Sequence, residues 1–307
     1  MTAEYYGYDA MDRLTRIVVT DGTNLISDVA WSYDTDQNVT AITTRVNNNG
    51  ALRTDTYAYS YDDDHRPTNT AYGSVSESIT YDGYSRVTGK TVQNSGNTVL
   101  STTYAYRDID AEHTTTQVSS LTSSFGGNTV SHSYTYDANG NILSDGSTTY
   151  AYDSLNQLVR VDSQKENKST TYSYDIRGNL LERKEYAYTT GTLGTATKTV
   201  SYAYGDSTWK DLMTSYSGQE ITYDTIGNPL KYRDGMNFTW KNGRQLATYS
   251  KGPVSASYEY DINGTRTKKI YTTLAGSVTT EYYYNNGMFL GFYRSDGFDV
   301  RPLMDPS

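Results

Sequence analysis

Residues that could carry out catalysis are sparse in this sequence. It contains three histidines (His65, His113 and His132) and no cysteine. None of the histidines shares a motif with a serine nucleophile, and neither Gly-x-Ser-x-Gly nor His-Glu-x-x-His occurs. A pair of carboxylates for glycoside hydrolysis could be chosen at will among 35 acidic residues, so no pair stands out. We therefore predict no catalytic residue and no enzymatic activity.

Three acidic clusters could in principle bind calcium. They are Asp34-Thr-Asp36-Gln-Asn38, Asp62-Asp-Asp64 and Asp108-Ile-Asp110. Calcium takes six to eight oxygen ligands, and the first cluster copies only the start of an EF-hand loop, without its glycine and distal glutamate. We interpret these carboxylates as turn caps or solvated side chains. The sequence thus predicts no metal site and no cofactor.

The composition is unusual in its aromatic residues. The 307 residues include 33 tyrosines but only five phenylalanines, and aliphatic side chains are too few for a conventional core. The net charge of −9 argues against a nucleic-acid partner, because such binders carry basic patches. No stretch approaches the ~18 apolar residues of a membrane helix, and no signal peptide is visible at the N-terminus. We predict neither a nucleic-acid partner nor a membrane segment.

The tyrosines belong to a repeat that runs through the chain. The dipeptide Tyr-Asp occurs nine times, and degenerate copies at Tyr106, Tyr204, Trp240 and Tyr284 fill the gaps. These 13 aromatic residues, called anchors below, recur about every 23 residues from Tyr8 to Tyr284. Most have a second aromatic two residues upstream, as at Tyr172, which is the period of a β-strand.

The sequence after each Tyr-Asp predicts a tight turn. In six of nine copies the third residue after the aspartate is Gly, Asn or Asp, which tolerate positive φ. The aspartate can accept hydrogen bonds from backbone N–H groups of the turn, and an apolar strand then restarts. Each unit is therefore predicted to be a β-hairpin with an aspartate-capped turn. The predicted structural residues are Tyr8, Asp9, Tyr33, Asp34, Tyr61, Asp62, Tyr81, Asp82, Tyr136, Asp137, Gly140, Tyr152, Asp153, Tyr174, Asp175, Gly178, Tyr223, Asp224, Gly227, Trp240, Tyr260, Asp261 and Gly264.

Thirteen hairpins predict an all-β protein built as a long curved or spiral ribbon, because open twisted sheets rarely exceed about ten strands without curling. We expect residues 1–307 to form a single repeat domain, with 294–307 as a non-repeat tail. Columns of tyrosine rings, about 4.8 Å apart across the ladder, should replace a compact core, and stability should come from contacts between neighbouring units. Residues 107–132 and 189–199 interrupt the repeat. We interpret both as longer hairpin loops, with a domain boundary as the alternative.

Arginine recurs in the turns, at the fourth residue after the turn aspartate in three units and at the third residue after Lys241 in the unit of Trp240. The four positions are Arg13, Arg66, Arg86 and Arg244. We expect these side chains to pair with the aspartate of a neighbouring hairpin rather than to bind an anion. Such exposed pairs contribute roughly 0–1 kcal/mol.

Two units carry a resemblance that can be named. Tyr136-Asp-Ala-Asn-Gly-Asn-Ile142 and Tyr174-Asp-Ile-Arg-Gly-Asn-Leu180 resemble the YD repeats of the Rhs family, which are also found in wall-associated proteins, the Tc toxin C component and teneurins. The segment Tyr282–Phe292 is similar to the stretch just before that family's Rhs core. The resemblance implies a hollow spiral β-shell enclosing a polypeptide, usually a C-terminal toxin domain, in a secreted or surface protein of bacteria. The core that cuts its own chain is absent, and Asp305-Pro306 lacks the residues that complete its motif, so no self-cleavage is expected.

The predicted function is therefore a non-catalytic scaffold, part of an Rhs-type shell. Its partner would be the downstream polypeptide of the same protein, a cargo or toxin domain. The alternative is a cell-surface adhesion module that binds glycan or protein, since aromatic faces stack on sugars. Because the tyrosines recur at a fixed place in every hairpin, we favour packing of the sheet over a ligand surface.

Overall fold

The computed structural model describes residues 2–48 and 50–304, which form β-strands and one 3-10 turn at Arg233–Gly235. The predicted all-β class and the succession of antiparallel hairpins are confirmed. The strands group into three antiparallel sheets of 11, 9 and 9 strands, each in chain order. In the described residues, no helix has the length and apolar character needed to cross a membrane.

The first sheet covers the N-terminal part of the chain. In order it contains β1 (Thr2–Tyr8), β2 (Leu14–Asp21), β3 (Asn24–Tyr33), β4 (Val39–Asn48), β5 (Ala51–Tyr61), β6 (Pro67–Tyr72), β7 (Val75–Tyr81), β8 (Val87–Asn94), β9 (Asn97–Asp108), β10 (Thr114–Phe125) and β11 (Asn128–Ser133).

The second sheet covers the middle of the chain, and the third sheet follows it. The second contains β12 (Thr135–Tyr136), β13 (Ile142–Ser144), β14 (Thr148–Tyr152), β15 (Leu158–Ser163), β16 (Lys168–Tyr174), β17 (Leu180–Ala187), β18 (Lys198–Ala203), β19 (Ser215–Tyr216) and β20 (Gln219–Glu220). The third contains β21 (Thr222–Tyr223), β22 (Pro229–Tyr232), β23 (Met236–Lys241), β24 (Gln245–Lys251), β25 (Val254–Tyr260), β26 (Arg266–Thr273), β27 (Gly276–Asn285), β28 (Met288–Arg294) and β29 (Asp299–Val300).

The strands follow the repeat closely. All nine Tyr-Asp tyrosines are the last residue of a strand. The strand pairing shifts by one residue at this point, as between Ser60 and Tyr61 or Ser173 and Tyr174. Such a shift is a β-bulge, which strengthens the local twist of the strand pair. The repeat therefore sets both the end of each strand and the geometry of the turn.

The chain divides into two compact units. The first consists of residues 1–104, 123–129 and 258–307, and the second of 105–122 and 130–257. The assignment of residues 1–307 to one domain stays a prediction. Of the two interruptions, 189–199 contains the expected loop between β17 and β18, whereas 107–132 is mostly paired strand, with β10 and β11 joined by a turn at Gly126-Gly127. The expectation of a long loop over 107–132 was wrong, because its threonines and valines favour strands.

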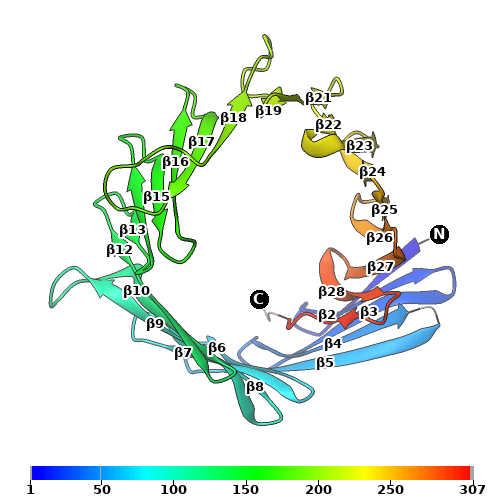
Figure 1. Cartoon of the computed structure of the whole chain (residues 1–307). Helices are drawn as coiled ribbons and strands as arrows, with labels where there is room; N and C mark the ends of the chain where they lie inside the picture. The colour runs from blue at the N-terminus through cyan, green and yellow to red at the C-terminus, as the bar shows by residue number, and fades with distance from the viewer. Residues whose placement is uncertain (1, 49, 305–307) are drawn as a thin grey trace. The chain divides into compact units, whose positions relative to one another are not determined.

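The first unit contains a packed core, contrary to the expectation that no compact core forms. Val29, Ile42, Val46 and Tyr57, all buried, belong to β3, β4 and β5. Strands β27 to β29 lie against this side of the sheet (Figure 1), and Leu290 on β28 joins the cluster. We call residues 276–304 the C-terminal cover. Two layers of β-structure thus enclose a core that the hairpins alone would not have.

The predicted tail at 294–307 begins as the last residue of β28 and then forms β29. Its described part ends at Met304, which is buried in the core of the first unit. Asp305-Pro306 lies outside the described residues. The tail, although it does not follow the repeat, therefore belongs to the C-terminal cover.

Candidate functional site

The aspartate of each Tyr-Asp unit caps its turn with Oδ1, and in seven of the nine units Oδ2 also accepts a side-chain hydrogen bond. In the first repeat unit, Asp9 Oδ1 accepts hydrogen bonds from the backbone N–H groups of Met11 (2.9 Å) and Arg13 (3.0 Å). Its Oδ2 accepts a bond from the side chain of Arg13. The same backbone pattern recurs at Asp34, Asp62, Asp82, Asp137, Asp175, Asp224 and Asp261.

The third residue after the aspartate adopts positive φ in all nine Tyr-Asp units. Gly140, Gly178 and Gly227 have φ of 85–87°, as expected for glycine. His65 and Gln37 adopt the same region, with φ of 62° and 71°. At these two positions the turn imposes a conformation that the residue type does not favour.

These hydrogen bonds stabilise the ionised aspartate. The side-chain bond from the neighbouring asparagine is the main cause that lowers the pKa of Asp34, Asp137 and Asp175 below its usual value. At Asp62 the side chain of Arg66 has the same effect on the pKa. The turns are therefore built for the charged carboxylate.

Arg13, Arg66 and Arg86 pair with the aspartate of their own hairpin, so for these three the prediction of pairing with a neighbouring hairpin's aspartate was wrong. Arg244 instead donates to the backbone carbonyl oxygen of Ile226 in the preceding turn (3.0 Å). Arg13 binds Asp9 at 2.7 Å, and Arg66 binds Asp62 at 2.7 Å. The guanidinium then extends to the next unit, where Arg13 Nη1 donates to the carbonyl oxygen of Asp34 (3.1 Å). Four residues of separation bring the arginine back over its own turn, which explains the local pair. The contact to the next unit is a backbone contact.

The anchors link each unit to the one before it through a hydrogen bond that the sequence analysis did not find. The hydroxyl of Tyr33 donates to the carbonyl oxygen of Leu14, six residues after the anchor Tyr8 of the preceding unit (2.7 Å). At Trp240 the indole N–H makes the equivalent bond to Pro229 (2.7 Å). Equivalent or similar bonds join Tyr61 to Val39, Tyr81 to Pro67, Tyr136 to Val118, Tyr152 to Ile142, Tyr174 to Leu158, Tyr204 to Leu180 and Tyr223 to Met213.

This bond explains why anchors are tyrosine and not phenylalanine. The ring must bring a donor to the neighbouring strand, and tryptophan is the other aromatic side chain with an N–H donor at its tip. The ratio of 33 tyrosines to five phenylalanines was the signal that could have revealed it. Burial raises the pKa of Tyr33, Tyr174 and Tyr223, so the hydroxyl keeps its proton for this bond.

The expected column of anchor rings needs a correction in its spacing. Each unit contributes two strands, so successive anchors lie two strand spacings apart, about 9.6 Å rather than about 4.8 Å. The hydroxyl bond crosses this gap by reaching the strand between them. Close ring pairs do occur elsewhere, as between Tyr57 and Tyr72, whose centroids are 5.0 Å apart.

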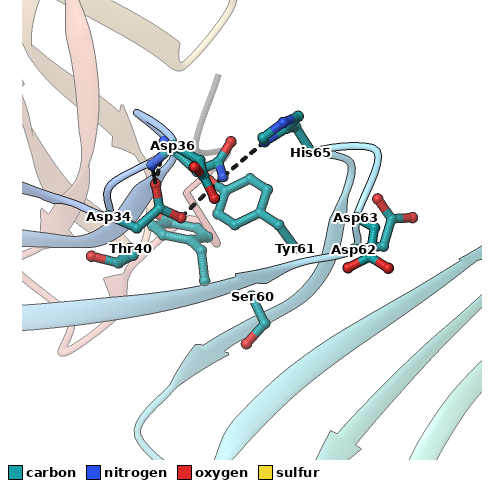
Figure 2. A pocket seen from close by; sticks show the side chains of 10 residues that line it. Asp34, Asp36, Thr40, Ser60, Tyr61, Asp62, Asp63 and His65 are labelled. Carbon is teal, nitrogen blue, oxygen red and sulfur yellow. Dashed lines mark hydrogen bonds between the residues drawn. The ribbon is translucent and has the colours of Figure 1, made fainter.

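A cavity of about 440 Å³ lies between two neighbouring turns of the first unit (Figure 2). One side is formed by the turn of Asp34, Asp36 and Asn38, and the other by the turn of Asp62, Asp63 and His65. Tyr59, Ser60, Tyr61 and Thr40 complete the lining. The cavity therefore combines the first two acidic clusters of the sequence with aromatic rings.

A second cavity of about 390 Å³ lies in the second unit, over β14 to β17. Its lining mixes His132, Tyr150 and Tyr172 with charged residues such as Lys168 and Arg183. The charges are largely paired, since Lys168 binds Glu166 and Arg183 binds Glu185, both at 2.9 Å. This cavity has no marked preference for either sign of charge.

A network of four charged residues fixes the C-terminal cover to the first sheet. Arg53 on β5 binds Asp299 of the cover at 2.9 Å, and Arg301 of the cover binds Asp55 on β5 at 2.9 Å. Asp55 is almost fully buried and also accepts a hydrogen bond from Tyr72 (2.8 Å). The two ion pairs run in opposite directions, so each layer contributes one cation and one anion.

Arg53 also takes the place of an anchor. Its Nη2 donates to the carbonyl oxygen of Leu290 (2.7 Å), which lies six residues after the last anchor, Tyr284. In seven other units this position accepts the bond from the next anchor. The last unit of the repeat is therefore capped by a side chain from the first sheet.

The three histidines occupy separate places. His65 contacts the side chain of Asn38 (3.2 Å), His113 contacts Asp110 (2.7 Å), and His132 stacks on Tyr134. In residues 2–48 and 50–304, no group of three or more His, Cys, Asp or Glu side chains is arranged to hold a metal ion.

Three comparisons with known proteins relate this geometry to a family. Residues 74–203 match the family model described as Teneurin YD-shell. The chain is 30% identical over 151 residues to the tRNA3(Ser)-specific nuclease WapA of Bacillus spizizenii, an alignment that covers 44% of this chain and 6% of the nuclease.

Solved structures show the same fold. A structure of TcdB2-TccC3 without its hypervariable C-terminal region matches with a TM-score of 0.51 and 14% identity over 95% of this chain. The Tc holotoxin pore of Photorhabdus luminescens, with a mutation in TccC3, matches with a TM-score of 0.51 and 13% identity over the same share. The chain spans 20% of each of these toxin chains. The resemblance stated from the sequence is confirmed.

Proposed function

We propose that this chain, a YD-repeat protein of the Rhs type, is a non-catalytic section of a β-shell wall that encloses a polypeptide cargo. The observation that carries the proposal is the hydrogen bond that nine anchors make to the preceding repeat unit. It repeats along the chain, as from Tyr61 to Val39 and from Tyr174 to Leu158. A wall must be continuous, and this bond supports continuity by linking successive hairpins.

The mechanism we propose is geometric. The hairpins close their own backbone hydrogen bonds within the sheet, and the turns are capped by ionised aspartates. A wall of this kind needs no aliphatic interior in each unit, so it can separate an enclosed chain from solvent with little more than one layer of sheet.

The cargo is the finer part of the proposal. The two kinds of relative are a nuclease and a toxin assembly that has a hypervariable C-terminal region. We propose that the partner of this chain is likewise a downstream domain of the same polypeptide, carried by a secreted or surface-located protein of bacteria. The relatives are much longer than this chain, which supports a role as one section of a larger wall.

A non-catalytic role is supported by how the possible catalytic groups are used. The turn aspartates are engaged in backbone capping, and His113 contacts Asp110 in an exposed turn. None of these contacts places a histidine beside a serine hydroxyl.

Protease protection of a marker tests the proposal. A flexible peptide with a single protease site would be attached after Ser307, and a matched protein would carry it before Met1. We expect the C-terminal marker to be cut several-fold more slowly under native conditions, and at the same rate once the protein is unfolded. Equal cleavage at both ends of the native protein would count against enclosure.

A further inference from the structure

The fourth residue after the turn aspartate changes type in three successive units, from Arg13 to Asn38 to Arg66. In the first of these units, the Arg13 guanidinium lies over the ring of the next anchor, with its carbon 4.6 Å from the Tyr33 centroid. It also donates to the carbonyl oxygen of Asp34, the aspartate of that next turn (3.1 Å). This position between two turns therefore holds a guanidinium.

The third unit repeats the arrangement. The Arg66 guanidinium carbon lies 4.7 Å from the ring centroid of Tyr81, and its Nη1 is 3.4 Å from the carbonyl oxygen of Asp82. Nη1 also donates to Ser85 Oγ (3.0 Å). Two units on either side of Asn38 thus use the same position in the same way.

Asn38 is too short to fill this position. Its side-chain amide reaches Asp34 Oδ2 (3.0 Å) and His65 Nδ1 (3.2 Å), where it ends. The cavity of about 440 Å³ lies beside it and is lined by Tyr61 and Asp62, the equivalents of the residues that receive Arg13 and Arg66 (Figure 2).

The lining has the charge that a guanidinium requires. Asp34 caps its own turn and Asp62 is paired with Arg66, whereas the Asp36 and Asp63 side chains are exposed at the rim. Four carboxylates, of which Asp62 is already paired, therefore line a cavity to which the Asp34 turn contributes no arginine of its own. An arginine side chain offers a planar cation that stacks on aromatic rings and forks onto carboxylates.

We propose that this cavity binds the guanidinium of an arginine side chain presented by another polypeptide. The bound group would take the position that Arg13 and Arg66 occupy in the neighbouring units, with the rim carboxylates of Asp36 and Asp63 adding attraction. This is a binding site in addition to the proposed wall function and does not depend on it. A point-charge ammonium fits less well, because it lacks the planar face and the fork.

The turn of Asp137 in the second compact unit offers a matched control. Asn141 makes the same contacts as Asn38, to Asp137 Oδ2 (2.8 Å) in its own turn and to Asn156 Oδ1 (2.8 Å) in the next. There, Asn139 stands in place of Asp36, and Ser154 in place of Asp63. The position for a guanidinium exists at both Asn38 and Asn141, but of these two turns only the one at Asn38 has the acidic rim.

The experiment titrates the whole protein with N-acetyl-arginine amide and, separately, with N-acetyl-lysine amide, and follows binding by NMR shifts of His65 and Asn38. We expect saturable binding of the arginine probe and about tenfold weaker binding of the lysine probe, because the ammonium cannot fork. Asn38→Arg should abolish binding by filling the position from within, whereas Asn141→Arg should leave it unchanged. Circular dichroism checks that both variants fold.

Two further variants keep the test independent of Asn38. Asp36→Asn and Asp63→Asn alter exposed carboxylates without removing a turn cap, and each should weaken binding of the arginine probe several-fold. The proposal is overturned if the arginine probe does not bind, if Asn38→Arg binds it as well as the natural protein does, or if the lysine probe binds equally.

Discussion

The two compact units cover their sheets in different ways. In the first unit, the C-terminal cover presses Leu290 and Met304 onto Val29, Ile42 and Tyr57. In the second unit, the loop at 188–197 folds over β15 and β16 through polar contacts instead. Arg160 donates to the carbonyl oxygens of Thr189 (2.8 Å) and Gly191 (2.9 Å), and Ser169 Oγ donates to that of Thr189 (2.9 Å).

The residues below each cover match this difference. The first unit buries valine, isoleucine and tyrosine side chains together with polar residues such as Thr44 and Asp55, whereas the residues buried on β15 and β16 below the loop are polar: Asp162, Ser163, Ser169 and Thr170. The turns and the anchor bonds are the same in both units. The repeat therefore determines the hairpins, and the residues between its motifs determine whether a unit gains an apolar core. The predictions below test this comparison.

The largest effect should come from removing an apolar ring beneath the C-terminal cover. Tyr57 is fully buried, and burial raises its pKa to about 12. Tyr57→Ala should lower the free energy of unfolding by about 3–5 kcal/mol, as large-to-small core substitutions do. Urea unfolding measures the change.

Tyr57→Phe is the matched control for that experiment. The Tyr57 hydroxyl is buried and makes no hydrogen bond with the described residues. Replacing it with hydrogen should leave stability unchanged or slightly increased, because an unsatisfied polar group is removed. A loss comparable to that of the alanine variant would indicate that the hydroxyl, and not the ring, holds the core.

The next effect concerns the charge network under the cover. Arg53→Met removes one of the two arginine partners of both Asp55 and Asp299 and leaves Arg301 as the cation shared by the two carboxylates. Breaking a buried pair by removing one partner costs about 3–5 kcal/mol, and the remaining arginine should keep the loss near the lower limit. Lys184→Met, which removes a partly exposed pair with Glu182, is the control and should cost less than about 1 kcal/mol. Thermal unfolding of both variants decides the point.

A smaller effect should follow from removing one anchor bond. Tyr174→Phe removes the hydroxyl that donates to Leu158 and should cost about 0.5–1.5 kcal/mol, while the ring stays in place. Ser173→Ala, on the adjacent exposed side chain, should stay within about 0.5 kcal/mol. If the two variants are equally stable in urea, the anchor bond does not stabilise the contact between neighbouring repeat units.

In the second unit, Ser169→Ala should loosen the polar cover without unfolding the sheet. Ser169 both donates to and accepts from Thr189, so its loss frees the loop at 188–197. We expect faster amide exchange or proteolysis confined to this loop, with a loss of about 1 kcal/mol or less in global stability. A large global loss would show that the polar cover contributes as much as the apolar one.

Acid should act on both units alike. The pKa values of Asp34 and Asp62 in the first unit, and of Asp137 and Asp175 in the second, are lowered by hydrogen bonds to the charged form. A lowered pKa contributes stability that is fully present above the unfolded value near 3.8 and is lost as pH falls through the folded value. Urea midpoints measured from pH 6 to pH 2 should fall in this window, and Asp175→Asn should make the fall smaller. A flat profile would contradict the turn assignment.

The hairpins and turns could be predicted from the sequence because their determinants are local. Asp175 and Gly178 lie within one turn and repeat elsewhere, so composition and spacing reveal them. The anchor bond was not predicted, although the excess of tyrosine over phenylalanine indicated a role for the hydroxyl. The acceptor of Tyr174 lies 16 residues away in the sequence and becomes its neighbour only when the strand order is known.

The C-terminal cover could not be predicted, because nothing local encodes it. Arg53 and Leu290 are 237 residues apart, and the segment after Phe292 leaves the repeat pattern. The cavity at Asn38 illustrates the same limit. Its two acidic clusters were visible, but their meeting across neighbouring hairpins depends on the strand order.

The bond from Arg53 to Leu290 has a consequence for how the molecule comes apart. Proteins made of stacked repeats usually lose structure by fraying, since a terminal repeat has a neighbour on one side alone. Here the opening and closing segments of the polypeptide share one interior and one set of ion pairs. Detaching either extremity uncovers the other, so the first unit should melt in a single step from both extremities together.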